Sequence, residues 1–249
     1  MTAWYEQSFS REYLALYPHR DREEAVRDVD RILALLGPSL REPILDLGCG
    51  AGRHLIALWA AGYRNLAGLD LSHDLLAEAR ARFSKEDISG IELVEADMRR
   101  LPYSAHFSTV LSLFTSFGYF ADPEDDRHVL CAVHRALRPG GRFLIDTLGR
   151  TATIASLVRE EEKVIGTRRL HIRRTLSEDG DRVEKETHVV DSAGQRTYHE
   201  SVRLYSARAL TEDLQCAGFA HVACYGSLDG DPYVENSARL VAIADKAAS

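Results

Sequence analysis

Short apolar runs alternate with helix-like segments four times between residues 43 and 147. The apolar runs cover residues 43–47, 65–70, 91–97, 107–114 and 142–147. Between them apolar residues recur at helical spacing, as in the segment that starts at Ser72, a helix-capping residue, and reaches Phe83. This alternation is typical of a mostly parallel sheet with helices on both faces. In such sheets, ligands bind beyond the carboxyl ends of the strands.

The pattern changes after residue 150. Residues 151–159 predict a helix, and three later segments with alternating polarity predict strands: 167–177, 182–190 and 195–205. The turns between these strands, E-D-G-D and D-S-A-G, favour hairpins. The charged run E-E-E-K at 160–163 indicates the solvated end of an element. We therefore expect residues 151–206 to form an antiparallel insertion over the ligand cleft, within a single domain that spans residues 1–249.

The composition of the 249 residues is that of an ordinary globular protein, with 45% hydrophobic and 28% charged residues. The net charge of 31 − 38 = −7 gives no overall electrostatic case for nucleic-acid binding. No signal-peptide pattern is visible, and no apolar run approaches the ~20 residues of a membrane span. Four cysteines without a C-x-x-C pair indicate reduced thiols and a cytoplasmic protein. No H-E-x-x-H pattern occurs, so no metal is expected. Monomer and homodimer both stay open.

Three glycines, Gly48, Gly50 and Gly52, follow the first apolar run at every second position. Glycine permits a positive φ and lets a ligand approach the main chain closely. The loop leads into a helix, whose N-terminus favours negative charge, so we expect a ligand with an anionic end. Asp70 lies 20 residues after Gly50 and ends the second strand. An acid at that place typically binds ribose hydroxyls.

A dinucleotide-binding fold is the alternative from a different functional class. Its fingerprint, G-x-G-x-x-G, requires a third glycine where helix and sheet pack closely. When the pattern starts at Gly48, Arg53 takes that third place, and the spacing here is G-x-G-x-G. This argues against a nicotinamide-dependent oxidoreductase but leaves it as an alternative.

The segment D-L-G-C-G-A-G-R at 46–53 resembles motif I of class I S-adenosylmethionine-dependent methyltransferases. G-L-D-L-S, E-A-D-M and L-R-P-G-G-R-F-L-I-D resemble their later motifs, so the resemblance extends over residues 44–146. It implies an α/β, Rossmann-like, mostly parallel seven-stranded sheet, with a reversed hairpin at the C-terminal edge. It also implies S-adenosyl-L-methionine as cofactor and S-adenosyl-L-homocysteine as product. F-T-S-F-G-Y-F and the insertion are similar to small-molecule methyltransferases, including sugar N,N-dimethyltransferases and glycine N-methyltransferase-like enzymes.

The resemblance also implies roles for matching residues. The motif I residues surround the methionine end of the cofactor: Asp46, Gly48, Cys49, Gly50 and Gly52. Asp70 takes the ribose hydroxyls, and Leu71 packs against the adenine. Asp97 accepts from the adenine amino group, and Met98 packs on the ring. Leu113 lies along the cofactor after the fourth strand.

Residues 1–37 are expected to form an N-terminal lid and helix, because the segment is rich in aromatic residues. Similar enzymes close such a lid over cofactor and substrate, and aromatic faces suit a cationic sulfonium. We expect Tyr17 and Arg20 to contact the cofactor, Arg20 at the methionine carboxylate. Tyr13 and His19 are expected to contact the substrate.

Further substrate contacts are expected after the fourth strand, at Ser116, Phe117 and Tyr119, and in the insertion at Arg203. Methyl transfer is an in-line displacement on an activated sulfonium, so positioning and exclusion of water dominate. No residue is compelled by type and spacing to act as a catalytic base. The resemblance to small-molecule methyltransferases implies a small-molecule acceptor with a nitrogen or oxygen nucleophile. A tRNA or protein methyltransferase is the alternative within the same class.

Overall fold

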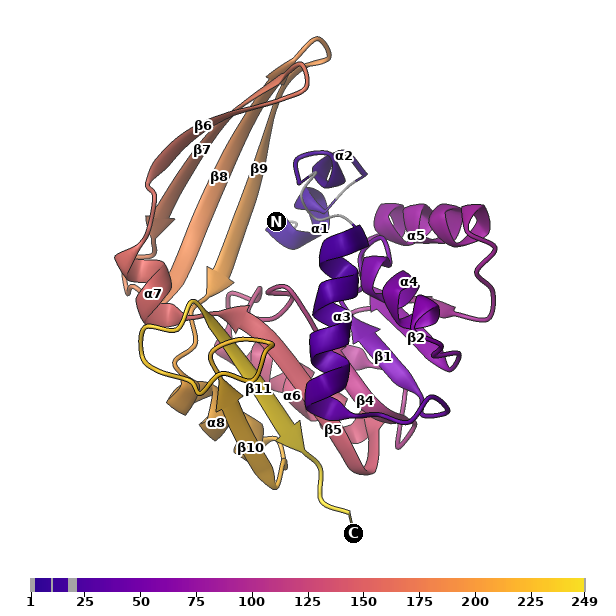
Figure 1. The fold of residues 1–249 in the computed structure, drawn as a ribbon. Helices are drawn as coiled ribbons and strands as arrows, with labels where there is room; N and C mark the ends of the chain where they lie inside the picture. The colour runs from indigo at the N-terminus through magenta and orange to yellow at the C-terminus, as the bar shows by residue number, and fades with distance from the viewer. Residues whose placement is uncertain (1–2, 10, 18–21, 249) are drawn as a thin grey trace.

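The computed structural model describes residues 3–9, 11–17 and 22–248. Its central sheet has seven strands in the order β10-β11-β5-β4-β1-β2-β3 (Figure 1). The strands are β1 Ile44–Leu47, β2 Leu66–Asp70, β3 Glu92–Glu95, β4 Phe107–Ser112, β5 Leu137–Leu148, β10 His221–Tyr225 and β11 Arg239–Asp245. Only β11 runs antiparallel to its neighbours β5 and β10 within this described sheet. The mostly parallel seven-stranded sheet is therefore confirmed, with its reversed hairpin at one edge.

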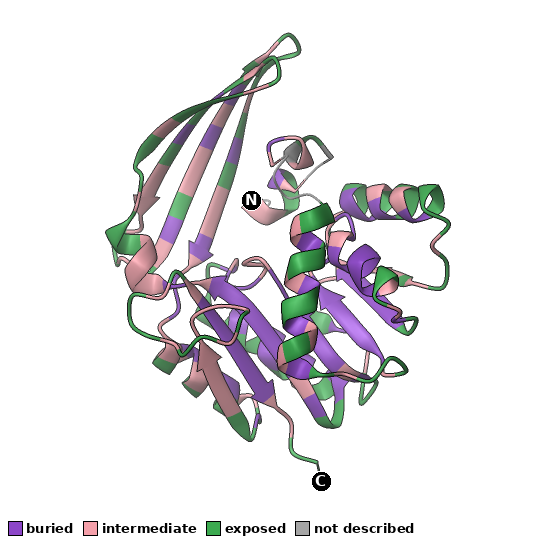
Figure 2. Cartoon of the chain, in the orientation of Figure 1, coloured by how far each residue is buried: buried purple, intermediate pink, exposed green. Residues whose placement is uncertain are grey.

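Helices cover both faces of this sheet. The first face packs against α3 Arg22–Leu36, α4 Arg53–Ala60 and α5 His73–Lys85. The other face packs against α6 Pro123–Ala136 and α8 Ala207–Cys216. All four residues of β1 are buried, which explains why its sequence reads as a nearly continuous apolar run. Figure 2 shows the central strands buried and the outward face of α3 exposed.

A second sheet of four antiparallel strands rises from the carboxyl edge of the first (Figure 1). It follows α7 Arg150–Ala155 and consists of β6 Glu160–Ile165, β7 Arg168–Leu176, β8 Arg182–Asp191 and β9 Gly194–Arg203. The charged run at 160–163, expected to be the end of an element, is part of β6. Acidic residues weaken strand propensity, but Glu160 lies opposite Arg173, and Arg174 forms an ion pair with Glu161 at 2.9 Å. Opposite charges across the pair and an exposed edge position favour this strand.

One face of the second sheet covers the N-terminal helices α1 Trp4–Ser8 and α2 Arg11–Leu14. Its buried residues pack against Leu16, and they are Leu170, Ile172, Val189 and Tyr198. Ser8 Oγ donates to the carbonyl oxygen of His199 at 2.8 Å, and Tyr17 Oη donates to Glu200 Oε1 at 2.7 Å. The described N-terminal residues 3–9 and 11–17 thus lie under the four-stranded sheet, beside the ends of the central strands.

Candidate functional site

A cavity of about 700 Å³ lies where the central sheet, the N-terminal helices and the four-stranded sheet meet. Loops at the carboxyl ends of four parallel strands form its floor, with Asp46, Gly48, Asp70, Asp97 and Leu113 among the lining residues. The N-terminal segment contributes Tyr5, Phe9, Leu14 and Tyr17. The four-stranded sheet contributes Arg174, Val183, Lys185, Glu200 and Val202. The strand ends therefore converge on one site, as expected for this sheet type.

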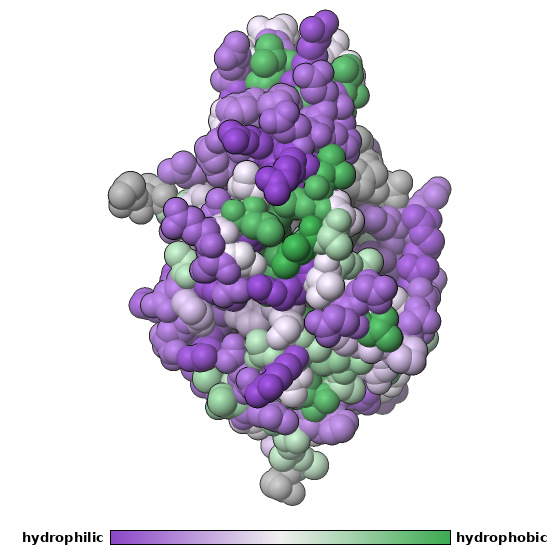
Figure 3. All heavy atoms as spheres, turned by 90° about the vertical axis from the view of Figure 1, so that its left-hand side faces the viewer, coloured by the Kyte–Doolittle hydropathy of each residue, from purple (hydrophilic) through white to green (hydrophobic). Residues whose placement is uncertain are grey.

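Apolar residues line one side of this cavity. Leu157 and Val158, in the segment after α7, line it, and Val158 and Ile154 are also exposed on the outer surface. In Figure 3, hydrophobic side chains gather in a hollow between the four-stranded sheet and the body of the molecule. This side offers a ligand an apolar surface next to the cavity.

The glycine loop meets two steric demands. Gly48 has a φ of +76°, and a Cβ there would lie 2.9 Å from Ser116 Cβ, so glycine lets the loop after β4 approach. Gly52 has a φ of +77°, and a Cβ there would lie 2.8 Å from the Phe83 ring. Gly48, Cys49 and Gly50 line the cavity, whereas Gly52 is not among its lining residues. Gly52 instead lets α5 pack closely on the loop.

Asp70 joins two loops at the cavity floor. Its Oδ2 accepts from the backbone N–H of Gly50 at 2.7 Å, and its Oδ1 accepts from the N–H of Ser72 at 2.8 Å. Burial raises the pKa of this carboxyl group, and the backbone donors oppose that rise. Leu71 also lines the cavity and is partly exposed. The carboxylate and an apolar side chain are thus presented side by side.

Asp46 is a buried acid on β1 with an oxygen that lacks a partner. The residue is 1% exposed, and its Oδ2 accepts no hydrogen bond from the described residues. Burial raises the pKa of Asp46 to about 6, and the neighbouring His54 and Arg53 oppose that rise. A buried acceptor of this kind costs free energy unless something binds it. The residue therefore suits a cationic or hydrogen-bond-donating group in the cavity.

The other predicted cofactor residues lie around the same floor. Met98 and Leu113 line the cavity, as does Asp97. Asp97 begins a short 3₁₀ helix, Met98–Arg100, by accepting from the Arg99 N–H at 2.9 Å. The Arg99 side chain also donates to Asp97 Oδ2 at 2.6 Å. Part of the acceptor capacity of Asp97 is therefore used within the protein.

The loop after β4 is strained. Phe114 and Thr115 have left-handed backbone, with φ values of +55° and +66°, which is unfavourable for residues with side chains. Asp146 holds both: its Oδ2 accepts from Phe114 N–H at 3.0 Å, and its carbonyl oxygen accepts from Thr115 N–H at 2.9 Å. Arg239 Nε donates to Asp146 Oδ1 at 2.8 Å. Backbone strain of this kind is frequent at functional sites, and this loop forms a cavity wall.

The substrate residues expected after β4 divide into two groups. Ser116 and Tyr119 line the cavity, and the Tyr119 ring stacks on Phe9 with 5.5 Å between centroids. Phe117 does not line it: this side chain is 1% exposed and packs against the Tyr205 ring at 5.5 Å. We therefore correct Phe117 to a core residue. Its place after β4, which suggested a substrate contact, does not bring this side chain to the cavity.

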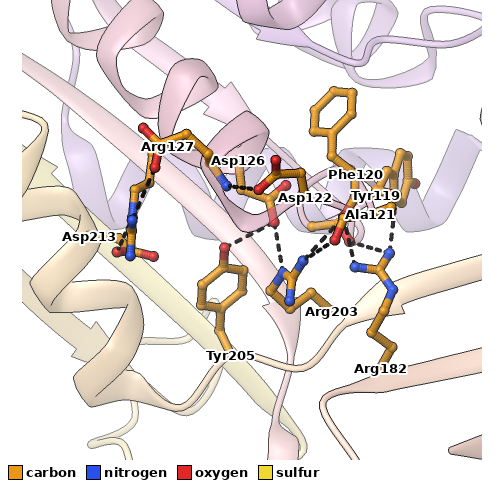
Figure 4. Close-up of polar contacts among 12 residues, drawn as sticks. Tyr119, Phe120, Ala121, Asp122, Asp126, Arg127, Arg182, Arg203, Tyr205 and Asp213 are labelled. Atoms are coloured by element: carbon orange, nitrogen blue, oxygen red, sulfur yellow. Dashed lines mark hydrogen bonds and ion pairs between the residues drawn. The ribbon is translucent and has the colours of Figure 1, made fainter. Parts of the chain in front are cut away.

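The expected substrate contact of Arg203 is also corrected. This side chain is not among the cavity-lining residues and belongs to a separate polar network (Figure 4). Its Nε donates to Asp126 Oδ2 at 3.0 Å, and its Nη2 donates to the carbonyl oxygen of Ala121 at 2.9 Å. Tyr205 Oη donates to the same Asp126 oxygen at 3.0 Å. Arg182 donates to the Phe120 carbonyl oxygen at 2.8 Å. The two arginines thus fasten the loop after β4 to the four-stranded sheet.

Only part of the predicted lid can be placed. Tyr17 lines the cavity and donates to Glu200. Tyr13 belongs to α2, but its side chain lies outside the described residues, as do His19 and Arg20 altogether.

Sequence reasoning missed several residues that line the cavity. Lys185 and Glu200 face each other across β8 and β9, and Lys185 Nζ donates to Glu200 Oε1 at 2.8 Å. The alternation along these strands indicated that every second side chain faces the cavity. The sequence did not show which of the two alternating sets that is. Arg53 was noted only as a misfit to the dinucleotide fingerprint, although it lines the cavity.

Residues 44–141 match a family model described as a methyltransferase domain. The match extends from β1 into β5 of the central sheet, and the strand order and the site described above agree with class I S-adenosylmethionine-dependent methyltransferases. The cofactor of this class is S-adenosylmethionine, and the residues present fit it. The positive-φ glycines leave the floor bare, and the unpartnered Asp46 oxygen suits the ammonium group of its methionine part.

Individual relatives agree with this class. The chain is 33% identical over 103 residues to dTDP-3-amino-3,4,6-trideoxy-alpha-D-glucopyranose N,N-dimethyltransferase from Streptomyces venezuelae, a match that covers 41% of each. It is 25% identical to cypemycin N-terminal methyltransferase from a Streptomyces species, over 90% of this chain and 96% of that one. The SAM-bound structure of an amino pentose methyltransferase from Micromonospora echinaspora has a TM-score of 0.66 and 25% identity. The two structures align over 95% of this chain and 97% of the other chain. The chain spans about half the length of the curated relatives that it matches at 33% and 31% identity: the matches cover 41% of the first relative and 52% of the second.

Two further features concern residues 3–9, 11–17 and 22–248. No helix there combines the length and the hydrophobicity that crossing a bilayer requires. In the same part of the chain, no three histidine, cysteine or acidic side chains are grouped as a metal site would need.

Proposed function

We propose that this protein transfers a methyl group from S-adenosylmethionine to a small-molecule acceptor with a nitrogen or oxygen nucleophile. One observation carries the proposal: the residues of the cofactor motifs and the inner face of the four-stranded sheet line the same cavity. A donor on the floor and an acceptor under the sheet share one enclosed space there. In-line approach and exclusion of water then supply most of the catalysis.

The cofactor-binding roles follow the lining residues. In our proposal Asp46 binds the ammonium group of the methionine part, and the N–H groups of the glycine loop approach the same end. Asp70 binds the ribose hydroxyls, and Asp97 accepts from the adenine amino group. Apolar contacts come from Leu71, Met98 and Leu113. The bound cofactor supplies an electrophilic methyl group, and the protein's residues orient it.

The acceptor half of the cavity favours an amine. The rings of Phe9 and Tyr119 line this half, and aromatic rings attract cations. The three relatives described above all carry names of amine or amino-sugar methyltransferases. We propose that residues 1–37 and 151–206 together cover this half, within one domain.

Isothermal titration with S-adenosylmethionine, S-adenosylhomocysteine and NADH tests the donor. Micromolar binding of the first two without NADH is expected, and binding of NADH alone would overturn the proposal. Formation of S-adenosylhomocysteine with an acceptor panel tests the acceptor. The panel pairs amino sugars with the matching hydroxyl sugars, and a free-amine peptide with its acetylated form, and it includes tRNA. Turnover with amino sugars is expected, whereas turnover with tRNA or peptide alone would contradict a small-molecule acceptor.

Replacement of Asp70 by alanine should weaken binding of S-adenosylmethionine by about 1–3 kcal/mol, because buried hydroxyl groups lose their acceptor. Titration calorimetry measures the loss. Asp74→Ala, in the first turn of α5 and absent from the cavity lining, is the matched control. Equal affinity of the Asp70 variant and the control would show that the acid is wrongly assigned.

A further inference from the structure

Arg53 is the first residue of α4 and lines the cavity immediately after the glycine loop. Its side chain is only 15% exposed. One end of the guanidinium group, Nη1, is bound by Glu24 of α3. Its Cζ lies 4.8 Å from the centre of the Phe114 ring, in the strained loop after β4. The side chain is thus fixed from two directions at the cavity wall.

The other end of the same guanidinium group is not satisfied. Arg53 Nη2 is buried and donates to no acceptor among the described residues. Buried donors of a charged group are normally hydrogen-bonded, because leaving them unpaired costs the full desolvation free energy. Because Nη1 points toward Glu24, Nη2 can donate to a second anionic group. A carboxylate is the group that a planar guanidinium binds best.

The unpartnered donor has an unpartnered acceptor as a neighbour. Asp46 also lines the cavity, and its Oδ2 has no hydrogen-bond partner in the part of the chain that the structure describes. The charge of Arg53 acts on this carboxyl group without a hydrogen bond between the two residues. A cationic donor and an anionic acceptor held close but apart match the two charges of an α-amino acid. The N-terminus of α4 adds a further favourable potential for the carboxylate.

We propose that Arg53 is the residue that binds the α-carboxylate of the methionine part of the cofactor, with Glu24 and Phe114 holding it in place. This inference rests on the proposed function and assigns to Arg53 a role that the sequence reasoning gave to Arg20. It makes the arginine after the glycine loop a selector for cofactors that carry a carboxylate. The dinucleotide fingerprint has a glycine at this position, so the same residue also distinguishes the two cofactor classes.

The test compares ligands that differ in one charged group. Dissociation constants are measured by calorimetry at pH 7.5 for S-adenosylmethionine, for decarboxylated S-adenosylmethionine and for 5′-methylthioadenosine. The second ligand lacks only the carboxylate, and the third lacks the whole amino-acid part. Arg53→Gln should weaken S-adenosylmethionine binding about 10- to 100-fold, the range for a charge-assisted hydrogen bond. The two ligands without a carboxylate should change by less than about threefold.

Three variants keep the result interpretable. Arg64→Gln removes an arginine that stacks on Trp59 beyond the other end of α4, and it should leave all three affinities unchanged. Arg53→Lys keeps the charge without the planar fork and should recover part of the loss. Arg20→Gln tests the competing assignment.

Specific outcomes overturn the inference. Equal losses for S-adenosylmethionine and its decarboxylated form in Arg53→Gln would show that Arg53 does not bind the carboxylate. A carboxylate-specific loss in Arg20→Gln alone would assign the role to Arg20. If the unaltered protein binds none of the three ligands, the proposed function itself fails. That result is distinct from failure of the Arg53 assignment, which requires binding by the unaltered protein.

Discussion

Replacement of Asp46 by asparagine is expected to weaken S-adenosylmethionine binding by about 10- to 100-fold, since the ammonium group of the cofactor loses a charged partner. The same variant should be more stable than the unaltered protein when no cofactor is present. Burial raises the pKa of Asp46 from 3.8 to about 6, so ionisation of this group opposes folding. A shift of about 2 units corresponds to roughly 3 kcal/mol as an upper value.

The pH dependence gives the sign of both effects. Below about pH 4 the carboxyl group is protonated in the folded and unfolded chains, and asparagine should give no extra stability. As the pH rises through 6, the unfolded chain ionises first, so the stability advantage of the asparagine variant grows and then stays constant. Cofactor affinity of the unaltered protein should fall below about pH 6, because binding the ammonium group requires the ionised carboxylate.

Thermal unfolding and calorimetry between pH 4 and 8 measure these two quantities. The asparagine variant also serves as the control for other effects of pH. Its cofactor affinity should not change near pH 6, because it has no carboxyl group at position 46 to ionise. Loss of affinity without a gain in stability at pH 8 would mean that Asp46 is ionised at little cost in the cofactor-free protein. Unchanged affinity would remove Asp46 from the site.

Asp126→Ala is expected to destabilise the protein by about 3–5 kcal/mol, the range for breaking a buried ion pair by removing one partner. Asp126 is 0% exposed and binds both Arg203 and Tyr205, so alanine leaves a buried charge and a buried hydroxyl group without their acceptor. The effect should exceed that of an ordinary surface change because all three side chains are largely buried.

Chemical denaturation measures this loss, and the same region supplies the control (Figure 4). Arg127, the next residue on α6, pairs with Asp213 at the protein surface, and Arg127→Ala should leave the unfolding midpoint unchanged. A double variant, Asp126→Ala with Arg203→Met, should recover part of the stability because no unpaired charge stays buried. Equal midpoints for Asp126→Ala and Arg127→Ala would contradict the role of this network.

The central sheet and its ligand edge were predictable because local patterns carry the information. The buried run of β1 and the acid that ends β2 need only neighbours in sequence to be recognised. Which of the two alternating sets of β9 side chains faces inward was not predictable in the same way. Tyr198, Glu200 and Val202 face inward, whereas Arg203 points to Asp126, and that choice depends on where the sheet meets the N-terminal helices. A sequence with polar residues at both parities does not encode it locally.

The remaining misjudged residues have similar explanations. Phe117 follows β4, where a substrate contact was expected, and only its packing against Tyr205 shows that it belongs to the core. β6 begins with three glutamates, which disfavour a strand, and it pairs with the arginine-rich strand β7. Arg53 gains its importance from Glu24 and Phe114, which are distant in sequence. In each case the deciding contact is between segments far apart in the chain.

A short N-terminal stretch links the two halves of the site. Ser72, which caps α5 beside Asp70, donates through Oγ to the Phe9 carbonyl oxygen at 2.6 Å, and Tyr17 donates to Glu200 on the opposite wall. In the function that we propose, this segment encloses both the donor product and the methylated acceptor. We expect these bonds to break before spent cofactor leaves and to form again around its replacement. We therefore expect the rate at which this segment opens to set the upper limit on turnover, however fast the methyl group moves.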